Sequence, residues 1–429
     1  MIVNVKVIAT CTIFLMVNIF PMQADAQYLD LMEEESKTSG TGFGFESEGG
    51  KGGMIIKVSN LNRSGEGSLA HALGQTGPRI IVFEVGVIIN LEGASLRIEN
   101  PFVTIAGQTA PSPGITIIKG GVQIPTHDVI IQHIRIRPGE VGHPKKSGWE
   151  VDGIAANGYR IVIDHCSVSW ATDENISPSG PRFEGENPEE WRKNTAHKVL
   201  ISNCIIAQGL SNSTHAKGEH SKGSLIHDNA TEIAIVKNLY ASNMRRNPLF
   251  KGGTQGIVVN NYIFNPGRNA IHYHLLPSEW NGHEPVTGKL SVVGNAIEFG
   301  KDTQKDMPLG YFIGEVELYW KNNKIIHQTS KIDLTGDHIL VDIPPVWPTG
   351  LATISEHQVV DHVLKNAGAR PWDRDQTDQA IIKEVKNGSN RIIDSEAEAG
   401  GYPAVPSTFK SFNADHWDMD RISEMTHER

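Results

Sequence analysis

The stretch IVIDHCSVSW, residues 161–170, decides the fold. It joins two short apolar runs through an Asp-His pair, and both runs are rich in Val, Ile or small residues. Each run is too short for a helix of ordinary length, and β-branched residues favour extended backbone, so each is predicted to be a strand with the polar pair at a bend between them.

The same pattern recurs along the chain. The copies are VIIQHIRIRP (129–138), IVIDHCSVSW (161–170), VLISNCIIAQ (199–208), IAIVKNLYAS (233–242), IVVNNYIFNP (257–266) and LSVVGNAIEF (290–299). Their polar residues His133, His165, Asn203, Asn238, Asn261 and Asn295 stand 32, 38, 35, 23 and 34 residues apart. Periods of this size indicate stacked repeats that bury a shared core.

The pattern therefore predicts an all-β solenoid of parallel strands. A doubly wound α/β fold is the alternative, but no amphipathic helix separates the strands. The recurrent Asn or His is expected to form an internal ladder that satisfies backbone groups at the turns. In this alignment Cys166 and Cys204 occupy equivalent positions in adjacent coils. A disulfide between them and two stacked free thiols remain equally open.

Composition and the chain ends set the domain organisation. The chain has 429 residues, of which 39% are hydrophobic and 21% charged, as in an ordinary soluble globular protein, and its 43 glycines indicate many turns. Residues 1–26 resemble a signal peptide, with Lys6, an apolar run at 7–20 and ADA before Gln27. That run is shorter than the about 20 residues that a spanning helix needs. We therefore expect a secreted protein with no membrane span.

The rest of the chain divides into three segments. Residues 27–53 form a small and polar leader, residues 54–400 the catalytic solenoid, and residues 401–429 a C-terminal tail. Helical patterns occur only at 68–73, 356–369 and 375–388, and the last two are expected to cap the stack or pack along it. The insertion 181–195 either lines a binding site or is plain surface. No nucleic-acid partner is expected, and the protein is expected to be a monomer.

Carboxylates flank the strand at 161–166. Asp152 precedes it in WEVDGI, and Asp173 and Glu174 follow it in SWATDEN at about the same distance. Converging carboxylates repel one another unless they bind a hard cation, and oxygen ligands alone suit Ca²⁺ better than zinc. A solvated acidic turn is the simpler alternative. Asp164 and His165 lie inside an apolar strand and are expected to be structural.

Two cationic segments follow on the next coils. The loop STHAKGEHSKGS (213–224) holds His215, Lys217, His220 and Lys222. Its histidines suggest zinc, but their spacing matches no strong zinc motif, and a mobile Lys-rich loop is the alternative. The stretch MRRNPLFKGG (244–253) places Arg246 and Lys251 on either side of a proline. A column of carboxylates and cations along one side of the stack suits an extended polyanion, even though the formal net charge is -10.

Several motifs in one order resemble the pectate lyases of polysaccharide lyase family one. They are GEGSLAHAL (65–73), GPRIIVFEVGVIINL (77–91), VTIAGQTAPSPGITI (103–117), IVIDHCSVSWATDEN (161–175), HSKGSLI (220–226), RRNPLFKGG (245–253), NAGARPWDRDQTD (366–378) and GGYP (400–403). The resemblance implies a right-handed parallel β-helix, Ca²⁺ dependence and β-elimination of polygalacturonate.

The resemblance also implies roles for individual residues. Asp152 and Asp173 would be calcium ligands, with Glu174 assisting. Arg246 would abstract the proton, and Lys222, Lys251, Lys217 and His220 would bind the polysaccharide. Asp164 and His165 would be structural supports. Lys251 stands where the family has a second arginine, so the charge is kept but not the bidentate geometry.

Other functions remain open at this stage. A lyase for another uronate polymer shares this chemistry, and a lyase for methylated pectin would need less Ca²⁺. A hydrolase on the same fold would need a carboxylate acid and base, and no clustered aspartate motif matches one. A β-helix that only binds polysaccharide would need neither Arg246 nor the metal aspartates.

Overall fold

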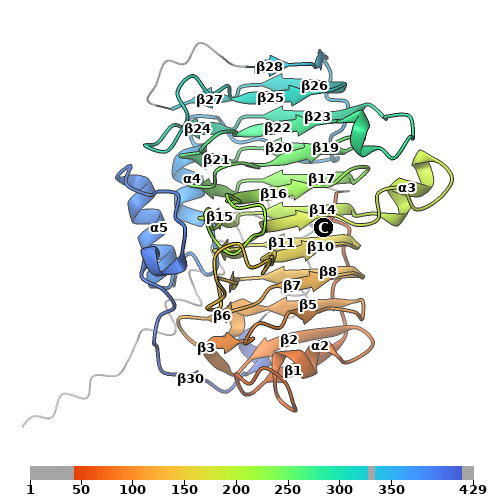
Figure 1. Cartoon of the computed structure of the whole chain (residues 1–429). Helices are drawn as coiled ribbons and strands as arrows, with labels where there is room; N and C mark the ends of the chain where they lie inside the picture. Colours follow the sequence, from red (N-terminus) through yellow and green to blue (C-terminus); the bar gives the residue numbers. More distant parts are fainter. Residues whose placement is uncertain (1–42, 327–333, 418–429) are drawn as a thin grey trace, which may run out of the picture.

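The computed structural model describes residues 43–326 and 334–417, which form a stack of coils (Figure 1). The predicted signal peptide and most of the predicted leader lie outside the described residues. In this part of the chain no helix is long and apolar enough to span a bilayer.

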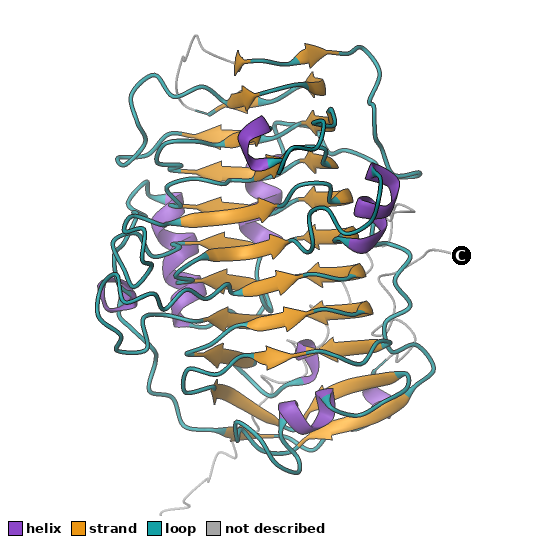
Figure 2. Ribbon diagram, turned by 45° about the vertical axis from the view of Figure 1, so that its right-hand side comes forward, coloured by secondary structure: helices purple, strands orange, loops and turns teal. Residues whose placement is uncertain are grey.

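The strands of the described residues form three sheets, and successive coils place one strand in each (Figure 2). An eleven-stranded sheet contains β1 (Met54–Val58), β2 (Arg79–Phe83), β5 (Val103–Ala106), β8 (His127–Gln132), β11 (Tyr159–Asp164), β14 (His197–Ser202), β17 (Thr231–Val236), β20 (Gln255–Val259), β23 (Gly288–Val293), β26 (Val316–Lys321) and β29 (Ile339–Leu340). A nine-stranded sheet contains β4 (Leu96–Arg97), β7 (Val122–Ile124), β10 (Ile154–Ala156), β13 (Glu174–Pro178), β16 (Lys222–Ile226), β19 (Leu249–Lys251), β22 (Ile271–His274), β25 (Gly310–Ile313) and β28 (Leu334–Gly336). A ten-stranded sheet contains β3 (Val85–Asn90), β6 (Ile115–Ile118), β9 (Ile134–Arg137), β12 (Ser167–Ser169), β15 (Ile205–Ala207), β18 (Leu239–Ala241), β21 (Tyr262–Phe264), β24 (Ala296–Glu298), β27 (Lys324–Ile325) and β30 (Thr408–Phe409).

Parallel, in-register pairing aligns like residues from coil to coil. Ile163 on β11 pairs with Ile131 on β8 and with Ile201 on β14, and all three are buried. Because aliphatic side chains of similar shape stack in each column, every coil buries its apolar face on its neighbours. The prediction of a parallel β-helix is confirmed.

The predicted ladder of polar residues is off by one residue in its second half. The strand register aligns His133, His165 and Asn203 with Lys237 and Asn260, all at positive φ, rather than with Asn238 and Asn261. The asparagine ladder occupies the next position: Asn238 donates to Asn261 Oδ1 at 3.0 Å, and Asn261 donates to Asn295 Oδ1 at 2.9 Å. The shift begins at Lys237, where the neighbouring Asn238 fits the pattern instead, and the asparagine pair at 260–261 fits either register.

The two cysteines belong to this ladder column. Cys166 and Cys204 are buried free thiols, and the backbone N–H of Cys166 donates to Cys204 Sγ at 3.4 Å. The N–H of Cys204 in turn donates to Asn238 Oδ1 at 2.8 Å. Their predicted equivalence in adjacent coils is confirmed, and the thiols stack without a disulfide.

Helices lie outside the three sheets. α2 (Leu69–Leu73), α4 (Val359–Asn366) and α5 (Gln376–Lys386) fall within the segments predicted to be helical. Apolar residues of α4 and α5 pack on the outer face of the ten-stranded sheet, where Ala207, Leu239 and Tyr262 are buried (Figures 1 and 2). A fourth helix, α3 (Pro188–Asn194), was not predicted. It lies in the insertion 181–195, where Asn187 caps the N-terminus and Pro188 takes the first helical position.

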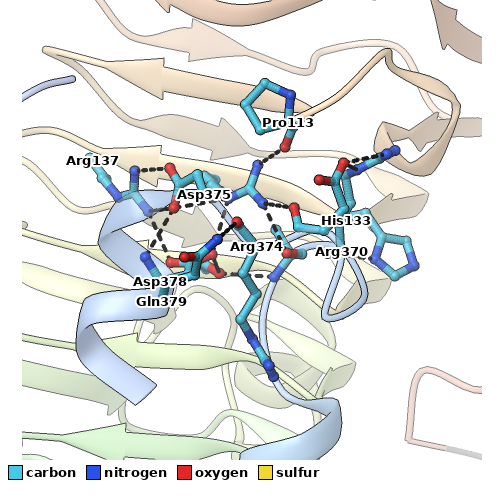
Figure 3. A network of polar contacts seen from close by, with 12 residues as sticks. Pro113, His133, Arg137, Arg370, Arg374, Asp375, Asp378 and Gln379 are labelled. Atoms are coloured by element: carbon cyan, nitrogen blue, oxygen red, sulfur yellow. Dashed lines mark hydrogen bonds and ion pairs between the residues drawn. The ribbon is translucent and has the colours of Figure 1, made fainter. Parts of the chain in front are cut away.

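Buried ion pairs fasten α5 to the stack (Figure 3). Arg137 at the end of β9 donates to Asp375 at 2.6 Å and 3.0 Å and to Asp378 at 2.9 Å. Arg135 donates to Asp378 at 3.0 Å. Asp375 also caps the helix by accepting the Asp378 N–H at 2.9 Å, so the two carboxylates sit at the positive end of the helix dipole.

The ends of the described chain also contact the stack. Phe43 and Phe45, in the predicted leader, are buried against the outer face of the eleven-stranded sheet. In the predicted tail, Tyr402 donates to the Pro138 carbonyl at 2.7 Å. β30 pairs antiparallel with β3, and the described part of the tail therefore extends the ten-stranded sheet.

Candidate active site

Five of the predicted site residues lie on, or directly before, four consecutive strands of the nine-stranded sheet. Asp152 precedes β10, Asp173 precedes β13, and Glu174 begins β13. Lys222 begins β16, and Lys251 ends β19. The strands β10, β13, β16 and β19 are neighbours in that order, so residues from four coils are stacked along one face.

The carboxylate cluster consists of Asp152, Asp173 and Glu174. One carboxylate oxygen from each lies within 4.8 Å of the others. The Glu174 N–H donates to Asp152 Oδ1 at 3.0 Å, which fixes two of the coils relative to one another. The convergence expected from the sequence is thus present in the structure.

Burial and like charge raise the pKa of Asp152 to about 8, with the Asp173 charge as the second cause. Burial alone would raise the pKa of Asp173 too, but its hydrogen bond with His220 and the nearby positive charges lower that pKa. Three carboxylates whose oxygen atoms lie this close together suit a divalent cation, and oxygen ligands suit a hard one. The residues present therefore fit calcium.

Arg246 faces this cluster from the loop between β18 and β19. Its guanidinium forms an ion pair with Glu174, and its side chain is largely buried. Burial lowers the pKa of Arg246, while Asp173 and Asp152 oppose that effect. Arg246 has a positive φ of 63°, so its backbone turns sharply before Pro248.

Lys222 and Lys251 add two cations on the neighbouring strands. Lys222 aligns with Glu174 in the strand register. Burial, and after it the charge of Arg245, lower the pKa of Lys222 to about 8. Lys251 is also buried, and it forms an ion pair with Glu279 from the loop after β22. Glu279 is therefore a direct counterion of Lys251.

Two of the predicted polysaccharide ligands, Lys217 and His220, lie in the loop between β15 and β16 and not on a strand of the nine-stranded sheet. Lys217 is exposed on its loop, and its described contact is a backbone hydrogen bond to His215 Nδ1 at 3.1 Å. His220 is buried and lies 2.7 Å from Asp173 Oδ1, next to the carboxylate cluster.

Asp164 and His165 sit apart from the cluster at the end of β11. They contact each other at 2.8 Å, and Ser202 Oγ donates to Asp164 at 2.7 Å. The His165 ring stacks on His133, whose Nδ1 accepts the N–H of Arg370 at 3.2 Å. These contacts connect the coils to the segment before α5.

Sequence reasoning missed the amide network behind the site. Asn175 Nδ2 donates to Asn243 Oδ1 at 3.2 Å, and Asn243 Nδ2 donates to Asn247 Oδ1 at 3.1 Å. All three are buried and lie next to Glu174 or near Arg246 in sequence. Asn175 Nδ2 also donates to the Lys222 carbonyl at 3.1 Å, so the network joins three coils and holds the loops that carry the charged residues. Their positions beside Glu174 and Arg246 were the only signal in the sequence.

Sequence reasoning also missed His272 and His274 on β22. Lys251 and His274 are register partners, and His272 is fully buried. Within the described residues, neither ring nitrogen of His272 has a hydrogen-bond partner. Burial and the charges of Lys251, Arg245 and Arg246 lower the pKa of His274 to about 4, so His274 is neutral at physiological pH.

The fold and the charged face together fit one class of enzyme, the parallel β-helix polysaccharide lyases. Two solved structures share the fold. The major allergen from cedar pollen has a TM-score of 0.56 and 16% identity over 76% of this chain and 92% of the allergen. A pectate lyase variant from Bacillus subtilis has a TM-score of 0.53 and 16% identity over 78% of this chain and 97% of its own.

Sequence comparison narrows the class to a family. A protein named probable pectate lyase C from Aspergillus oryzae is 32% identical over 383 residues, covering 84% of this chain and 80% of the relative. A protein of the same name from Aspergillus terreus is 32% identical over 372 residues with the same coverage. No family model matches the chain. The chain belongs to the pectate lyase family of these proteins, and it is a polysaccharide lyase.

Proposed function

We propose that this pectate lyase is a secreted, calcium-dependent enzyme that cleaves polygalacturonate by β-elimination and releases 4,5-unsaturated oligogalacturonides. The observation that carries the proposal is the placement of the carboxylate cluster beside Arg246 and Lys222 on consecutive coils. Cations repeated along the stack suit a polymer with a carboxylate on every sugar.

The carboxylate cluster would hold calcium. A bound calcium ion would supply positive charge next to the uronate carboxylate, which makes the C5 proton more acidic. Lys222 and Lys251 would neutralise uronate carboxylates of the polymer in the same way. Both side chains are largely buried, so their charges act through little solvent.

Arg246 would take the C5 proton. The C5–H electron pair then forms the C4–C5 double bond, the bond from C4 to the glycosidic oxygen breaks, and that oxygen takes a proton from water, whose hydroxide in turn removes the proton from Arg246. A guanidinium is an unusual base because its pKa is normally very high. The burial that lowers the pKa of Arg246 favours its neutral form and supports this role.

The test follows the ultraviolet absorbance of the unsaturated product. Purified protein is mixed with polygalacturonate in Ca²⁺, and again with a chelator present. An absorbance rise that requires Ca²⁺ is the expected result. No rise with polygalacturonate or any other uronate polymer would reject the lyase reaction itself, and a rise that survives chelation would reject calcium dependence.

Secretion is tested at the N-terminus. The sequence 1–26 is proposed to be removed on export, so the secreted protein should begin at Gln27. Mass spectrometry of the protein from culture medium and periplasm gives the mature N-terminus and the compartment together. A chain that retains residues 1–26 would contradict this part of the proposal. Size-exclusion chromatography with light scattering tests the expected monomer.

A second candidate substrate is partly methyl-esterified pectin. The ion pair between Lys251 and Glu279 favours it, because Glu279 offsets the positive charge that a uronate carboxylate would otherwise meet there. A sugar with a neutral ester at this position would not be repelled. Comparing initial rates on polymers of rising ester content separates the two substrates.

A further inference from the structure

A pair of histidines meets Asp173 directly beside the carboxylate cluster, and His220 Nε2 also lies 3.8 Å from Glu174 Oε1. His215 and His220 lie in the loop between β15 and β16, and their rings stack with centroids 3.5 Å apart and planes 12° apart. His220 Nε2 lies 2.7 Å from Asp173 Oδ1, and His215 Nε2 lies 3.7 Å from the same oxygen. The three ligand atoms are all within 4.8 Å of one another.

This set differs chemically from the carboxylate cluster. Imidazole nitrogens are preferred by borderline metals such as zinc and nickel, whereas calcium prefers oxygen ligands. Two imidazoles with one carboxylate form a three-ligand set that leaves coordination positions for water. Asp173 belongs to both sets, so one carboxylate is shared by an oxygen-only group and a nitrogen-rich group.

The surrounding loop holds the imidazoles in place. Both histidines are buried. On either side of His215, Thr214 Oγ1 donates to the Trp149 carbonyl at 2.6 Å and the Ala216 N–H donates to Glu150 Oε1 at 3.0 Å. Pre-formed ligands lose little conformational entropy on binding, and so this loop suits a metal site better than a mobile one would.

Glu150 is positioned to support His215 as a ligand. Its Oε1 lies 3.4 Å from His215 Nδ1, which also accepts the Lys217 N–H at 3.1 Å. A metal bound at Nε2 requires the ring proton on Nδ1. Glu150 would then accept a hydrogen bond from the Nδ1–H group, as carboxylates behind metal-bound histidines commonly do. On metal binding, His215 Nδ1 would therefore stop accepting a hydrogen bond from the Lys217 N–H and would instead donate one to Glu150.

We propose that Asp173, His215 and His220 form a binding site for a borderline divalent metal, with Zn²⁺ as the probe, and that this metal competes with calcium for Asp173. The binding of zinc is inferred from the side chains of Asp173, His215 and His220 alone. Inhibition through Asp173 rests in addition on the proposed calcium-dependent lyase function. Zinc is therefore an inhibitor that removes a ligand from the carboxylate cluster.

The binding test uses isothermal titration of the metal-free mature chain with Zn²⁺, and the absorption spectrum of the Co²⁺-loaded protein. His215→Ala and His220→Gln should each weaken Zn²⁺ affinity by more than the about 10–100-fold expected for the supporting change Glu150→Gln. His357→Gln is the matched control, because its side chain is 78% exposed. Circular dichroism of each variant confirms folding.

Affinity that stays unchanged in both histidine variants, or no Zn²⁺ binding to the parent chain, would overturn the proposed site. Competition is measured separately, by titrating Ca²⁺ into Zn²⁺-loaded protein while free Zn²⁺ is monitored with a dye. Release of Zn²⁺ by Ca²⁺ is expected, and simultaneous binding would overturn the sharing of Asp173. Neither measurement uses lyase activity, so an inactive protein would reject the proposed function without affecting these results.

Discussion

Glu174 forms an ion pair with Arg246 across two coils of the nine-stranded sheet, so the arginine proposed as the base lies against a proposed calcium ligand. This ion pair couples the carboxylate cluster to the proposed catalytic base. A calcium ion bound at the carboxylate cluster would compete with Arg246 for the negative charge of Glu174. The ion pair between Glu174 and Arg246 would then be weaker. Loss of that counterion would favour the neutral guanidine.

Replacing Arg246 with alanine should strongly reduce turnover while the fold is kept. We expect kcat on polygalacturonate to fall by about 10²–10⁴-fold, the usual contribution of a general base. The measurement is the initial rate of ultraviolet absorbance at saturating Ca²⁺. Arg97→Ala is the matched control, since Arg97 pairs with Glu99 on the surface. A kcat within twofold of the parent would reject Arg246 as the base.

Removing the Glu279 charge should change substrate preference. In Glu279→Gln, Lys251 loses its counterion, and we expect KM for fully de-esterified polygalacturonate to fall by up to about fivefold, as for an ion pair worth up to ~1 kcal/mol. The exposed Glu284 in the same loop provides the control Glu284→Gln. An unchanged ratio of kcat/KM between de-esterified and partly esterified polymers would contradict a specificity role for Glu279.

The repeat pattern of the sequence predicted the strands because buried parallel strands require continuous Val and Ile runs. It also placed Asp152 and Asp173 on either side of one strand, and loops leaving stacked coils return to the same face. For these reasons both the fold and the carboxylate cluster were accessible before the structure was known.

The pairing register of the strands and the contacts between residues far apart in the chain could not be predicted from the sequence. At Asn260 and Asn261 either residue fits the repeat, and only strand pairing decides between them. His215 and His220 match no zinc spacing because their third partner, Asp173, comes from another coil. Glu279 reaches Lys251 from a loop of no regular pattern, and the sequence contains no signal for that contact.

Asp173 in the carboxylate cluster and Asp164 outside it should respond differently to the same substitution. Asp173→Asn should raise the Ca²⁺ concentration needed for half-maximal rate, because it removes a charge from the carboxylate cluster. Asp164→Asn should leave the Ca²⁺ requirement unchanged and cost about 1–3 kcal/mol of stability, since one of the two buried oxygens that contact His165 and Ser202 becomes an amide nitrogen. Calcium titrations of activity and urea unfolding measure the two effects. A changed calcium requirement in Asp164→Asn would contradict its structural assignment.

Acid should unfold the protein partly through the ion pairs that fasten α5. Burial alone would raise the pKa of Asp375, but Arg137 and Arg135 lower that pKa below its usual value. The unfolded chain therefore binds more protons below about pH 4, and the stability from Asp375 is fully present above that pH and is lost as the pH falls through the lowered pKa. Asp375→Asn should reduce stability at pH 7 and flatten its decline on acidification.

The measurement is the free energy of unfolding in urea from pH 7 to pH 3. The exposed Asp342 gives the control Asp342→Asn, which should follow the parent curve. Because the remaining carboxylates titrate in both variants, the informative quantity is the difference in slope between Asp375→Asn and the parent. Equal slopes below pH 4 would mean that Asp375 titrates alike in the folded and unfolded chains. In that case the contacts with Arg137 would hold α5 in position without contributing to the pH dependence of stability.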